Sequence, residues 1–357
     1  MRRFAWVALL LMTACGSSSA AANVSPSPSA SASASASASA SASATSAPSP
    51  VGALPCKMPA ALRTNGTDVF LGWLNLPSGT TTDDPTHHVT QQGTLNGGII
   101  WATDHPPQLY GNGGAAWSNA INGWVSVQPD LLAPDGLHYA YLSADGKIHL
   151  SNAQSGQEAF VDNPMKLRPF AYTSAGVVLT NENAPSNGLW LLDPVTQNIA
   201  AISAPTANYE WVAAANGFAW GGDSPGTLGF PATKKVVTAQ IIPNPQIINP
   251  TNTATVAYTA PAGDSIADIA PDTKGGVLVI LAGSAPGLVY LPQGGSATTY
   301  PGIPGVNIAQ VGPLFRADAH GIWLYGNSGV FLFNTTTGLH KIAGAVNPAF
   351  ASAGDCV

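Results

Sequence analysis

The sequence predicts an all-β protein, a β-propeller of seven blades with six blades as the alternative. Three observations favour this fold. The 38 Gly and 30 Pro residues mark many turns, no long segment has the periodicity of an amphipathic helix, and a pattern of paired apolar strands recurs along the chain. A period near 40–45 residues with paired strands in each unit is typical of propellers, in which each unit forms a four-stranded blade.

The repeated unit is a turn that ends in glycine, an apolar strand, a second turn, another apolar strand and a polar turn. In six units a glycine stands directly before the first strand, at spacings of 38, 40, 41, 59 and 45 residues: Gly98, Gly136, Gly176, Gly217, Gly276 and Gly321. The long spacing reflects a Pro- and Asn-rich insertion at residues 230–256, and a further hairpin pattern at residues 65–85 brings the count to seven. The last unit predicts four strands, FRADAHG, IWLYG, GVFLFNTTTG and LHKIAG.

The N-terminus has the pattern of an export signal. Arg2 and Arg3 precede an apolar run from Phe4 to Met12, which is too short to cross a bilayer as a helix but has the length of a signal's apolar region. The segment Met-Thr-Ala-Cys that ends at Cys15 resembles the processing box of bacterial lipoproteins, with Met12 where leucine is usual. The resemblance implies cleavage before Cys15 and a diacylglycerol on its thiol. The alternative is an ordinary signal peptide followed by an unpaired cysteine.

The chain therefore divides into three parts. Residues 1–14 are expected to be the signal, and residues 15–50 are almost wholly Ser, Ala and Pro. Such a segment buries too little apolar surface to offset the entropy of ordering, so we expect a disordered tether. Residues 51–357 are expected to form the propeller.

The remaining cysteines suggest how the ring is fastened. With Cys15 lipidated, Cys56 and Cys356 remain, just inside the two ends of the folded region. Because exported compartments favour disulfides, we expect these two cysteines to pair where the first and last blades meet. Commonly the N-terminal segment of a propeller supplies a strand to the last blade at this junction.

Three segments resemble known propeller blades. Residues 131–157 (LLAPDGLHYAYLSADGKIHLSNAQSGQ) resemble the blades of TolB-type and WD40-like bacterial propellers. Residues 187–198 (NGLWLLDPVTQN) and 318–333 (DAHGIWLYGNSGVFLF) are similar to streptogramin-lyase-like and two-component-sensor propellers. Taken whole, the chain resembles lipoproteins of high-GC soil bacteria. The resemblance implies a fold and a cell-envelope location, but it transfers no catalytic residue because propellers host many unrelated functions.

The composition excludes one class of partner. Charged residues make up 8% of the chain, against about 25% in ordinary globular proteins. Without Arg2 and Arg3 the chain has 10 basic and 18 acidic residues, a formal charge of −8. Nucleic-acid binding depends on Lys and Arg, so we expect no nucleic-acid partner. The expected partners are a membrane, through the lipid at Cys15, and an envelope ligand or protein, with the chain as a monomer.

Two short segments match patterns of catalytic or metal-binding sites, but we interpret them as a turn and a loop. The segment GDSPG at residues 222–226 fits a Gly-x-Ser-x-Gly nucleophile pattern, but Pro225 lacks the N–H that an oxyanion site needs and no helix follows. The segment DDPTHH at 83–88 gathers two carboxylates and two imidazoles, but adjacent His87 and His88 cannot easily face one zinc ion from a strand. We expect a turn and a solvated loop. No nucleotide, calcium or zinc motif occurs, so we expect neither cofactor nor metal.

Aromatic and charged residues at the entry of two inner strands are the candidate ligand site. Tyr209, Glu210 and Trp211 lie at one such entry, and Arg168 lies at the equivalent place one blade earlier. Aromatic rings with a few polar groups at a channel mouth suit a sugar or peptide. The leading hypothesis is a surface-tethered, non-catalytic binding propeller of the cell envelope.

A propeller enzyme is the rival hypothesis. It would be a hydrolase or lyase that acts on an extracellular saccharide, with carboxylates converging on the central channel: Asp264, Asp268 and Asp318. A purely structural envelope protein is the third possibility.

Overall fold

The computed structural model describes residues 54–63, 68–95, 98–103, 114–181, 188–203, 209–223, 233–242, 254–347 and 349–357. By its contacts the chain divides into two units, Met1–Ala47 and Pro48–Val357, and all described residues belong to the second. The predicted signal, Cys15 and the tether lie outside them. Within the described residues no helix is long and apolar enough to cross a membrane.

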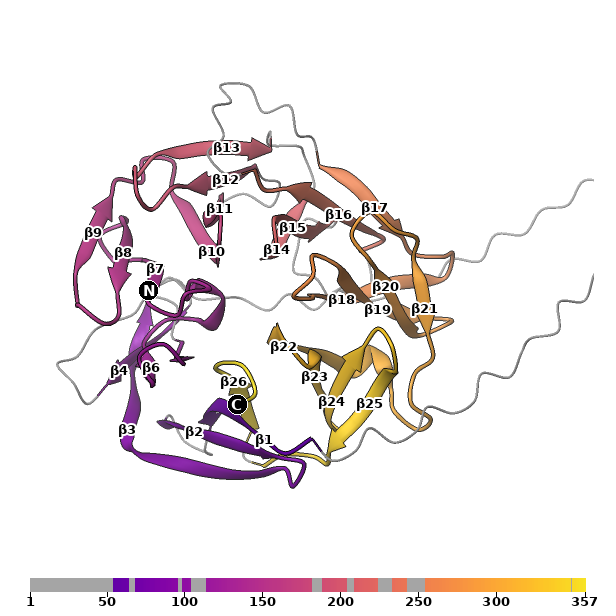
Figure 1. Cartoon of the computed structure of the whole chain (residues 1–357). Coiled ribbons are helices and arrows are strands. Elements are labelled where there is room, and N and C mark those ends of the chain that lie inside the picture. Colours follow the sequence, from indigo (N-terminus) through magenta and orange to yellow (C-terminus); the bar gives the residue numbers. More distant parts are fainter. Residues whose placement is uncertain are drawn as a thin grey trace, which may run out of the picture. The chain divides into compact units, whose positions relative to one another are not determined.

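The second unit is an all-β propeller of six blades arranged as a ring (Figure 1). Blade 1 contains, from the centre outwards, β26 (Ala349–Ser352), β1 (Cys56–Arg63), β2 (Asp68–Leu76), β3 (Thr80–Leu95) and β4 (Gly98–Thr103). A hairpin of β5 (Ala116–Ser118) and β6 (Gly123–Val125) and a short helix, η1 (Pro129–Leu131), precede blade 2. Blade 2 contains a single bridge from Leu132 to Tyr139, then β7 (His138–Leu142), β8 (Ile148–Asn152) and β9 (Glu158–Val161).

The other four blades share one strand order. Blade 3 contains β10 (Leu167–Thr173), β11 (Gly176–Asn181), β12 (Leu189–Leu192) and β13 (Ile199–Ser203), and blade 4 contains β14 (Glu210–Ala215), β15 (Phe218–Gly222), β16 (Lys235–Gln240) and β17 (Thr255–Thr259). Blade 5 contains β18 (Asp264–Pro271), β19 (Val277–Gly283), β20 (Gly287–Leu291) and β21 (Thr298–Tyr300). After η2 (Ile308–Gln310), blade 6 contains β22 (Val311–Asp318), β23 (Gly321–Gly326), β24 (Gly329–Asn334) and β25 (Gly338–Ala343).

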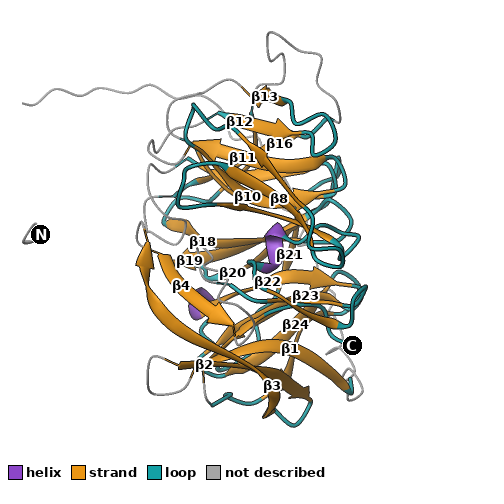
Figure 2. Ribbon diagram, turned by 90° about the vertical axis from the view of Figure 1, so that its left-hand side faces the viewer, coloured by secondary structure: helices purple, strands orange, loops and turns teal. Residues whose placement is uncertain are grey.

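In these four blades the chain starts at the centre of the ring and proceeds outwards (Figure 1). Equivalent inner strands therefore all run from one face of the ring to the other, and the side view shows loops and turns collected along both faces (Figure 2). We call the face where inner strands begin the entry face and the face where they end the exit face. The four strands predicted for the last unit are confirmed as β22 to β25.

The predicted propeller is confirmed, but with six blades, the alternative count. Gly98 begins β4, the outermost strand of blade 1, and the hairpin predicted at residues 65–85 supplies β2 and the start of β3 of the same sheet. The sequence pattern therefore counted one five-stranded blade as two units. The segment DDPTHH, expected in a loop, lies inside β3.

The periodic glycines mark the turn from the inner strand to the second strand at the exit face. Gly176 has φ +134° and Gly321 has φ +143°, values that L side chains rarely adopt. A Cβ at Gly176 would lie 2.5 Å from the Leu192 carbonyl oxygen, and one at Gly321 would lie 2.3 Å from the Phe333 carbonyl oxygen. These glycines therefore lie where the third strand of a blade packs closely against the turn between the first and second strands of the same blade.

Apolar cores fill the spaces between blades. A fully buried cluster that includes Leu167, Val177 and Ile148 joins blades 2 and 3, and another that includes Trp323 and Met58 joins blades 6 and 1. Because each blade buries both of its faces, the strands are apolar at successive positions rather than at alternate ones; β19 is buried over its first five residues.

The C-terminus closes the ring. Strand β26 pairs antiparallel with β1 and becomes the inner strand of blade 1, so the C-terminal segment completes the first blade, the reverse of the expected arrangement. The pairing continues to the last residue, because the Lys57 N–H donates to the Val357 carbonyl at 2.8 Å and the Val357 N–H donates back at 3.0 Å. Beside it Cys56 and Cys356 form the predicted disulfide, across a sequence separation of 300 residues.

Candidate functional site

The predicted ligand set lies on two adjacent inner strands at the entry face. A β-bulge follows Pro169 in β10 and Trp211 in β14, so Arg168 and Glu210 occupy equivalent positions in blades 3 and 4. Burial raises the pKa of Glu210, and the positive charge of Arg168 opposes this shift without cancelling it. The structure therefore brings Arg168 and Glu210 into electrostatic contact.

Trp211 requires a correction. Its side chain is 3% exposed and belongs to the apolar cluster between blades 3 and 4, against which the half-buried Tyr209 also packs. This packing places the indole in the core between the two blades and not at the channel mouth. It stabilises the blade interface and offers no surface to a ligand.

The carboxylates of the rival hypothesis do not converge. Asp264 begins β18 at the entry face and Asp318 ends β22 at the exit face, so the two are separated by about the length of an eight-residue strand, roughly 20 Å or more. Asp264 accepts hydrogen bonds from Ser284 Oγ and the Ala285 N–H, and both oxygens of Asp318 accept from neighbouring donors. Both carboxylates therefore stabilise the local structure through these hydrogen bonds.

Asp268 differs from them. It lies directly after the bulge of β18, and its only hydrogen bond among the described residues is accepted from the adjacent Ile269 N–H at 2.8 Å. Burial raises the pKa of Asp268 to about 6, while that hydrogen bond opposes the rise. Asp268 can thus hold a proton close to neutral pH.

The described residues also form a groove that the sequence did not predict. Three pockets of about 110, 560 and 490 Å³ adjoin one another on the exit face, because neighbouring pockets share lining residues. We call them together the interblade groove, since the two larger pockets lie between blades 2 and 3. The largest is lined by Ala133, Pro134, Asp135, His138, Tyr172, Thr173, Ser174, Ala175, Gly176, Asp193, Pro194 and Val195.

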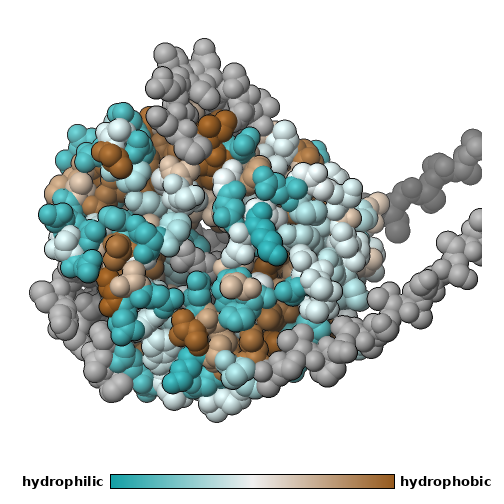
Figure 3. All heavy atoms as spheres, in the orientation of Figure 1, coloured by the Kyte–Doolittle hydropathy of each residue, from teal (hydrophilic) through white to brown (hydrophobic). Residues whose placement is uncertain are grey.

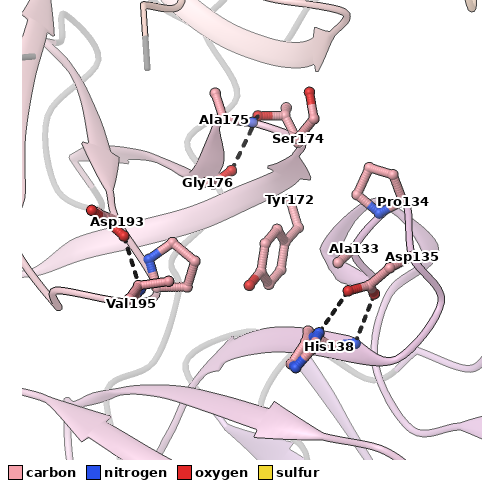
Figure 4. A pocket seen from close by; sticks show the side chains of 12 residues that line it. Ala133, Pro134, Asp135, His138, Tyr172, Ser174, Ala175, Gly176, Asp193 and Val195 are labelled. Atoms are coloured by element: carbon pink, nitrogen blue, oxygen red, sulfur yellow. Dashed lines mark hydrogen bonds and ion pairs between the residues drawn. The ribbon is translucent and has the colours of Figure 1, made fainter. Parts of the chain in front are cut away.

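Asp135 and His138 form one side of the groove (Figure 4). Asp135 Oδ1 accepts from the N–H groups of Leu137 and His138 at 2.7 and 3.0 Å, and Oδ2 lies 2.6 Å from His138 Nδ1. Burial alone would raise the pKa of Asp135, but the hydrogen bonds from His138 and Leu137 outweigh it and lower the pKa below its ordinary value. Asp135 is therefore ionised at neutral pH.

The second nitrogen of His138 is also engaged. Asn152 Oδ1 accepts from the N–H groups of Gln154 and Ser155, so the amide NH2 of Asn152 points to His138 Nε2 at 3.2 Å. The amide can only donate, so Nε2 accepts and the proton of the neutral ring is on Nδ1, facing Asp135. The Asp135–His138 pair resembles the first part of a proton relay, but its outer nitrogen is already occupied.

Tyr172 stands in the middle of the groove. Figure 4 shows its ring between Asp193 with Val195 on one side and Asp135 with His138 on the other. Burial raises the pKa of Tyr172 to about 12, and the negative charges of Asp135 and Asp193 add to the rise. The hydroxyl makes no hydrogen bond to any residue that the structure describes, so it can bond to a ligand.

Asp193 completes the groove from blade 3. Its Oδ1 accepts from the Val195 N–H at 2.8 Å, and its Oδ2 accepts from Thr196 Oγ1 at 2.8 Å. These bonds lower the pKa of Asp193 and fix the turn after β12. Val195, 87% exposed, projects at the rim. Asp135 and Asp193 each keep about one acceptor site for a ligand, because two carboxylate oxygens offer about four sites and three are occupied.

The opposite face of blade 2 carries a different polar cluster. Alternation along the strands places Tyr141, His149, Ser151 and Glu158 on the side away from blade 3. Glu158 Oε1 accepts from Tyr141 Oη at 2.7 Å and Ser151 Oγ at 2.8 Å, and His149 Nδ1 lies 3.1 Å away. Burial would raise the pKa of Glu158, but these bonds lower it. The cluster joins three strands of one blade.

The surface is polar with separate apolar patches on the face seen in Figure 3. Among the described residues no group of three or more His, Cys, Asp or Glu side chains is placed to hold a metal ion.

The GDSPG segment is described only in part. Gly222 ends β15, and the Asp223 carboxylate accepts hydrogen bonds from the N–H groups of Lys234 and Lys235, as expected where two strands are connected. The other three residues lie outside the described residues.

Fold and groove together define the class: a six-bladed β-propeller with an open groove between two blades. No family model and no curated protein sequence matches the chain. Among solved structures it is similar to a post-proline cleaving enzyme from Rickettsia typhi, with a TM-score of 0.46, 10% identity, and 82% of this chain aligned with 54% of the other. It is also similar to a puromycin-hydrolyzing peptidase of Mycobacterium tuberculosis (0.40; 12%; 84% and 56%) and to TolB of Acinetobacter baumannii (0.38; 10%; 82% and 67%).

The chain spans about half the length of the first of these proteins. At identities of 10–12% the likeness extends to the propeller fold and not to activity. The expected resemblance to TolB-type propellers concerns the fold alone, and the strand order of this chain shows that fold by itself.

Proposed function

We propose that the chain is an extracytoplasmic lipoprotein, anchored through Cys15, that binds a ligand in the interblade groove without transforming it. The single observation that carries the binding role is the groove itself, a formed concavity with an aromatic side chain and hydrogen-bonding groups converging on it. The engaged His138 nitrogens support binding over catalysis, because a general base needs a free nitrogen at the reacting atom.

The location rests on separate observations. The processing-box pattern before Cys15 and the Ser/Ala tether support an anchored protein, and the Cys56–Cys356 disulfide fits an oxidising compartment. The test is fractionation of cells that express the chain. Wild type should partition with membranes and carry a diacylglycerol mass, whereas Cys15→Ala should be released. Membrane partition that is unchanged in Cys15→Ala would contradict the anchor and leave the groove proposal untouched.

Thermal unfolding of the purified full chain tests the binding role. A panel of envelope saccharides and peptides should contain a ligand that raises Tm. At 100 times its Kd, a ligand specific for the folded state adds about 2.7 kcal/mol, or about 4 °C for a domain of this size.

Two variants locate the binding. Val195→Trp fills the rim of the groove and should abolish the shift, and Val256→Trp, at an exposed position of β17, should leave it unchanged. Equal shifts in wild type and Val195→Trp would place binding elsewhere. A panel with no shift at all would contradict the small-ligand role.

One observation favours the alternative, a propeller hydrolase or lyase acting on a saccharide. Glu210 and Asp268 lie on neighbouring inner strands, and burial raises the pKa of both. Such carboxyls suit general acid catalysis. Glycan hydrolysis by the wild type that Asp268→Asn abolishes and Val195→Trp spares would favour this function over groove binding.

A further inference from the structure

The charge distribution of the interblade groove limits the kind of ligand that can enter it. Asp135 and Asp193 flank Tyr172 from two different blades, and both have lowered pKa values. Among the described residues that line the three pockets, none is Lys or Arg. The two carboxylates of the largest pocket, Asp135 and Asp193, therefore face no Lys or Arg side chain among the described lining residues.

The two carboxylates are held in place before any ligand arrives. Asp135 is bonded by two backbone N–H groups and His138, and Asp193 by two backbone N–H groups and Thr196 Oγ1. Their unused lone pairs are acceptors only, so an anion would be repelled and a neutral hydroxyl would gain less than a charged donor. Two acceptors that are already held in place beside the apolar ring of Tyr172 can bind a cation with little rearrangement of the protein.

Tyr172 adds a second, independent requirement. Its ring packs partly against the apolar cluster between blades 2 and 3 and stands inside the largest pocket. The electron-rich face of a tyrosine attracts an ammonium or guanidinium group and also stacks on a flat apolar ring. A cationic ligand with a flat apolar portion could contact the Tyr172 ring and the carboxylates at the same time.

We propose that the interblade groove is selective for organic cations, with a protonated amine paired with the carboxylates that flank Tyr172 and an apolar portion of the ligand against the Tyr172 ring. This inference rests on the proposed groove binding and specifies its ligand class.

A series of three probes separates charge from shape. Benzylamine, benzyl alcohol and benzoate share one ring and differ in charge at neutral pH. Calorimetric titration of the purified full chain at low ionic strength should give benzylamine an affinity at least about 10-fold above benzyl alcohol, and benzoate no measurable binding. Because the interaction is between charges, the benzylamine affinity should fall several-fold between about 20 and 200 mM NaCl.

Substitutions test the location. Asp193→Asn keeps a side chain that can cap the turn and removes the charge, so it should weaken benzylamine about 5-fold or more. Val195→Lys introduces a competing cation at an 87% exposed rim position and should weaken it similarly. The matched controls are Asp145→Asn, another turn aspartate whose Oδ1 accepts from the Lys147 N–H, and Val256→Lys on β17. Both should retain wild-type affinity.

The outcomes are distinguishable. Equal affinity for benzylamine and benzyl alcohol, with both lost in Val195→Lys, would overturn the charge selectivity and leave groove binding intact. Benzylamine binding that survives Asp193→Asn and Val195→Lys would place the cation elsewhere and overturn the proposal. Absence of benzylamine binding at millimolar concentration would also overturn it. The unfolding temperature of each variant shows whether it is folded. If Asp193→Asn does not fold, Val195→Lys still tests the location of the site.

Discussion

Removing the disulfide between Cys56 and Cys356 should lower the stability of the propeller by several kcal/mol. The double variant Cys56→Ala/Cys356→Ala leaves the β26–β1 ladder in place, including the reciprocal backbone bonds between Lys57 and Val357. The folded ring should therefore persist, and the main effect should fall on the unfolded chain, which loses its cross-link.

The sequence separation sets the magnitude. A closed loop of 300 residues gives about 6 kcal/mol in the chain-entropy relation. Native disulfides commonly yield about 2–5 kcal/mol, so we expect a loss of about 3–6 kcal/mol. With an unfolding entropy of about 2 cal/mol/K per residue, this corresponds to a fall in Tm of about 5–10 °C.

The assay is urea denaturation of the purified chain, followed by tryptophan fluorescence, with wild type measured in the presence and absence of reductant. Reduced wild type and the double variant should unfold at the same lower urea concentration, and Cys15→Ala, which leaves both Cys56 and Cys356 in place, should match oxidised wild type. A difference below about 1 kcal/mol between oxidised and reduced wild type would refute the cross-link argument. Alkylation of two thiols in the native, unreduced domain would refute the disulfide itself.

Three further perturbations test single features of the ring. Asp318→Ala leaves two buried N–H donors without an acceptor and should cost about 2–4 kcal/mol by urea denaturation; an effect below 1 kcal/mol would show that water replaces the carboxylate. Gly321→Ala should cost about 2–4 kcal/mol, because its φ is +143° and a Cβ would meet a carbonyl oxygen at 2.3 Å. Gly146→Ala, with φ +82° and nothing within 4 Å, should cost about 1 kcal/mol, and equal costs would disprove the contact argument. Because the pKa of Asp268 is raised from 3.8 to about 6, the folded state binds its proton more tightly, and stability should fall as pH rises from about 4 to about 6. Asp268→Asn should remove this fall and stabilise the protein at pH 7 by up to about 3 kcal/mol, with no gain at pH 4; a pH profile parallel to that of wild type would contradict the assignment.

Local turn chemistry made the fold predictable, and the same feature misled the blade count. Gly176 and Gly321 recur because each inner turn requires a positive φ and close backbone approach. Gly98 satisfies the same sequence pattern but begins the outer strand of blade 1. A period along the chain identifies strands and turns, but it does not reveal that a C-terminal strand has joined an N-terminal sheet.

The groove could not be predicted for a different reason. Asp135 and Asp193 lie in two different turns, Pro-Asp-Gly and Asp-Pro-Val, and each has the ordinary role of capping its own turn. Only the packing of blade 3 on blade 2 brings them to either side of Tyr172. Conversely, Trp211 was expected at the channel mouth because it lies at a strand entry, but position along a strand does not tell whether a side chain faces the channel or the core between blades.

The closure by β26 has a consequence for how the protein is made. Synthesis proceeds from the N-terminus, so β1 waits with one edge unpaired while five further blades are completed. Its partner strand is supplied by the last nine residues of the chain. A chain truncated before residue 349 would therefore contain nearly all of the propeller but lack both β26 and Cys356. Blade 1 therefore cannot be completed before residues 349–356 have been made, although its other four strands come from the start of the propeller.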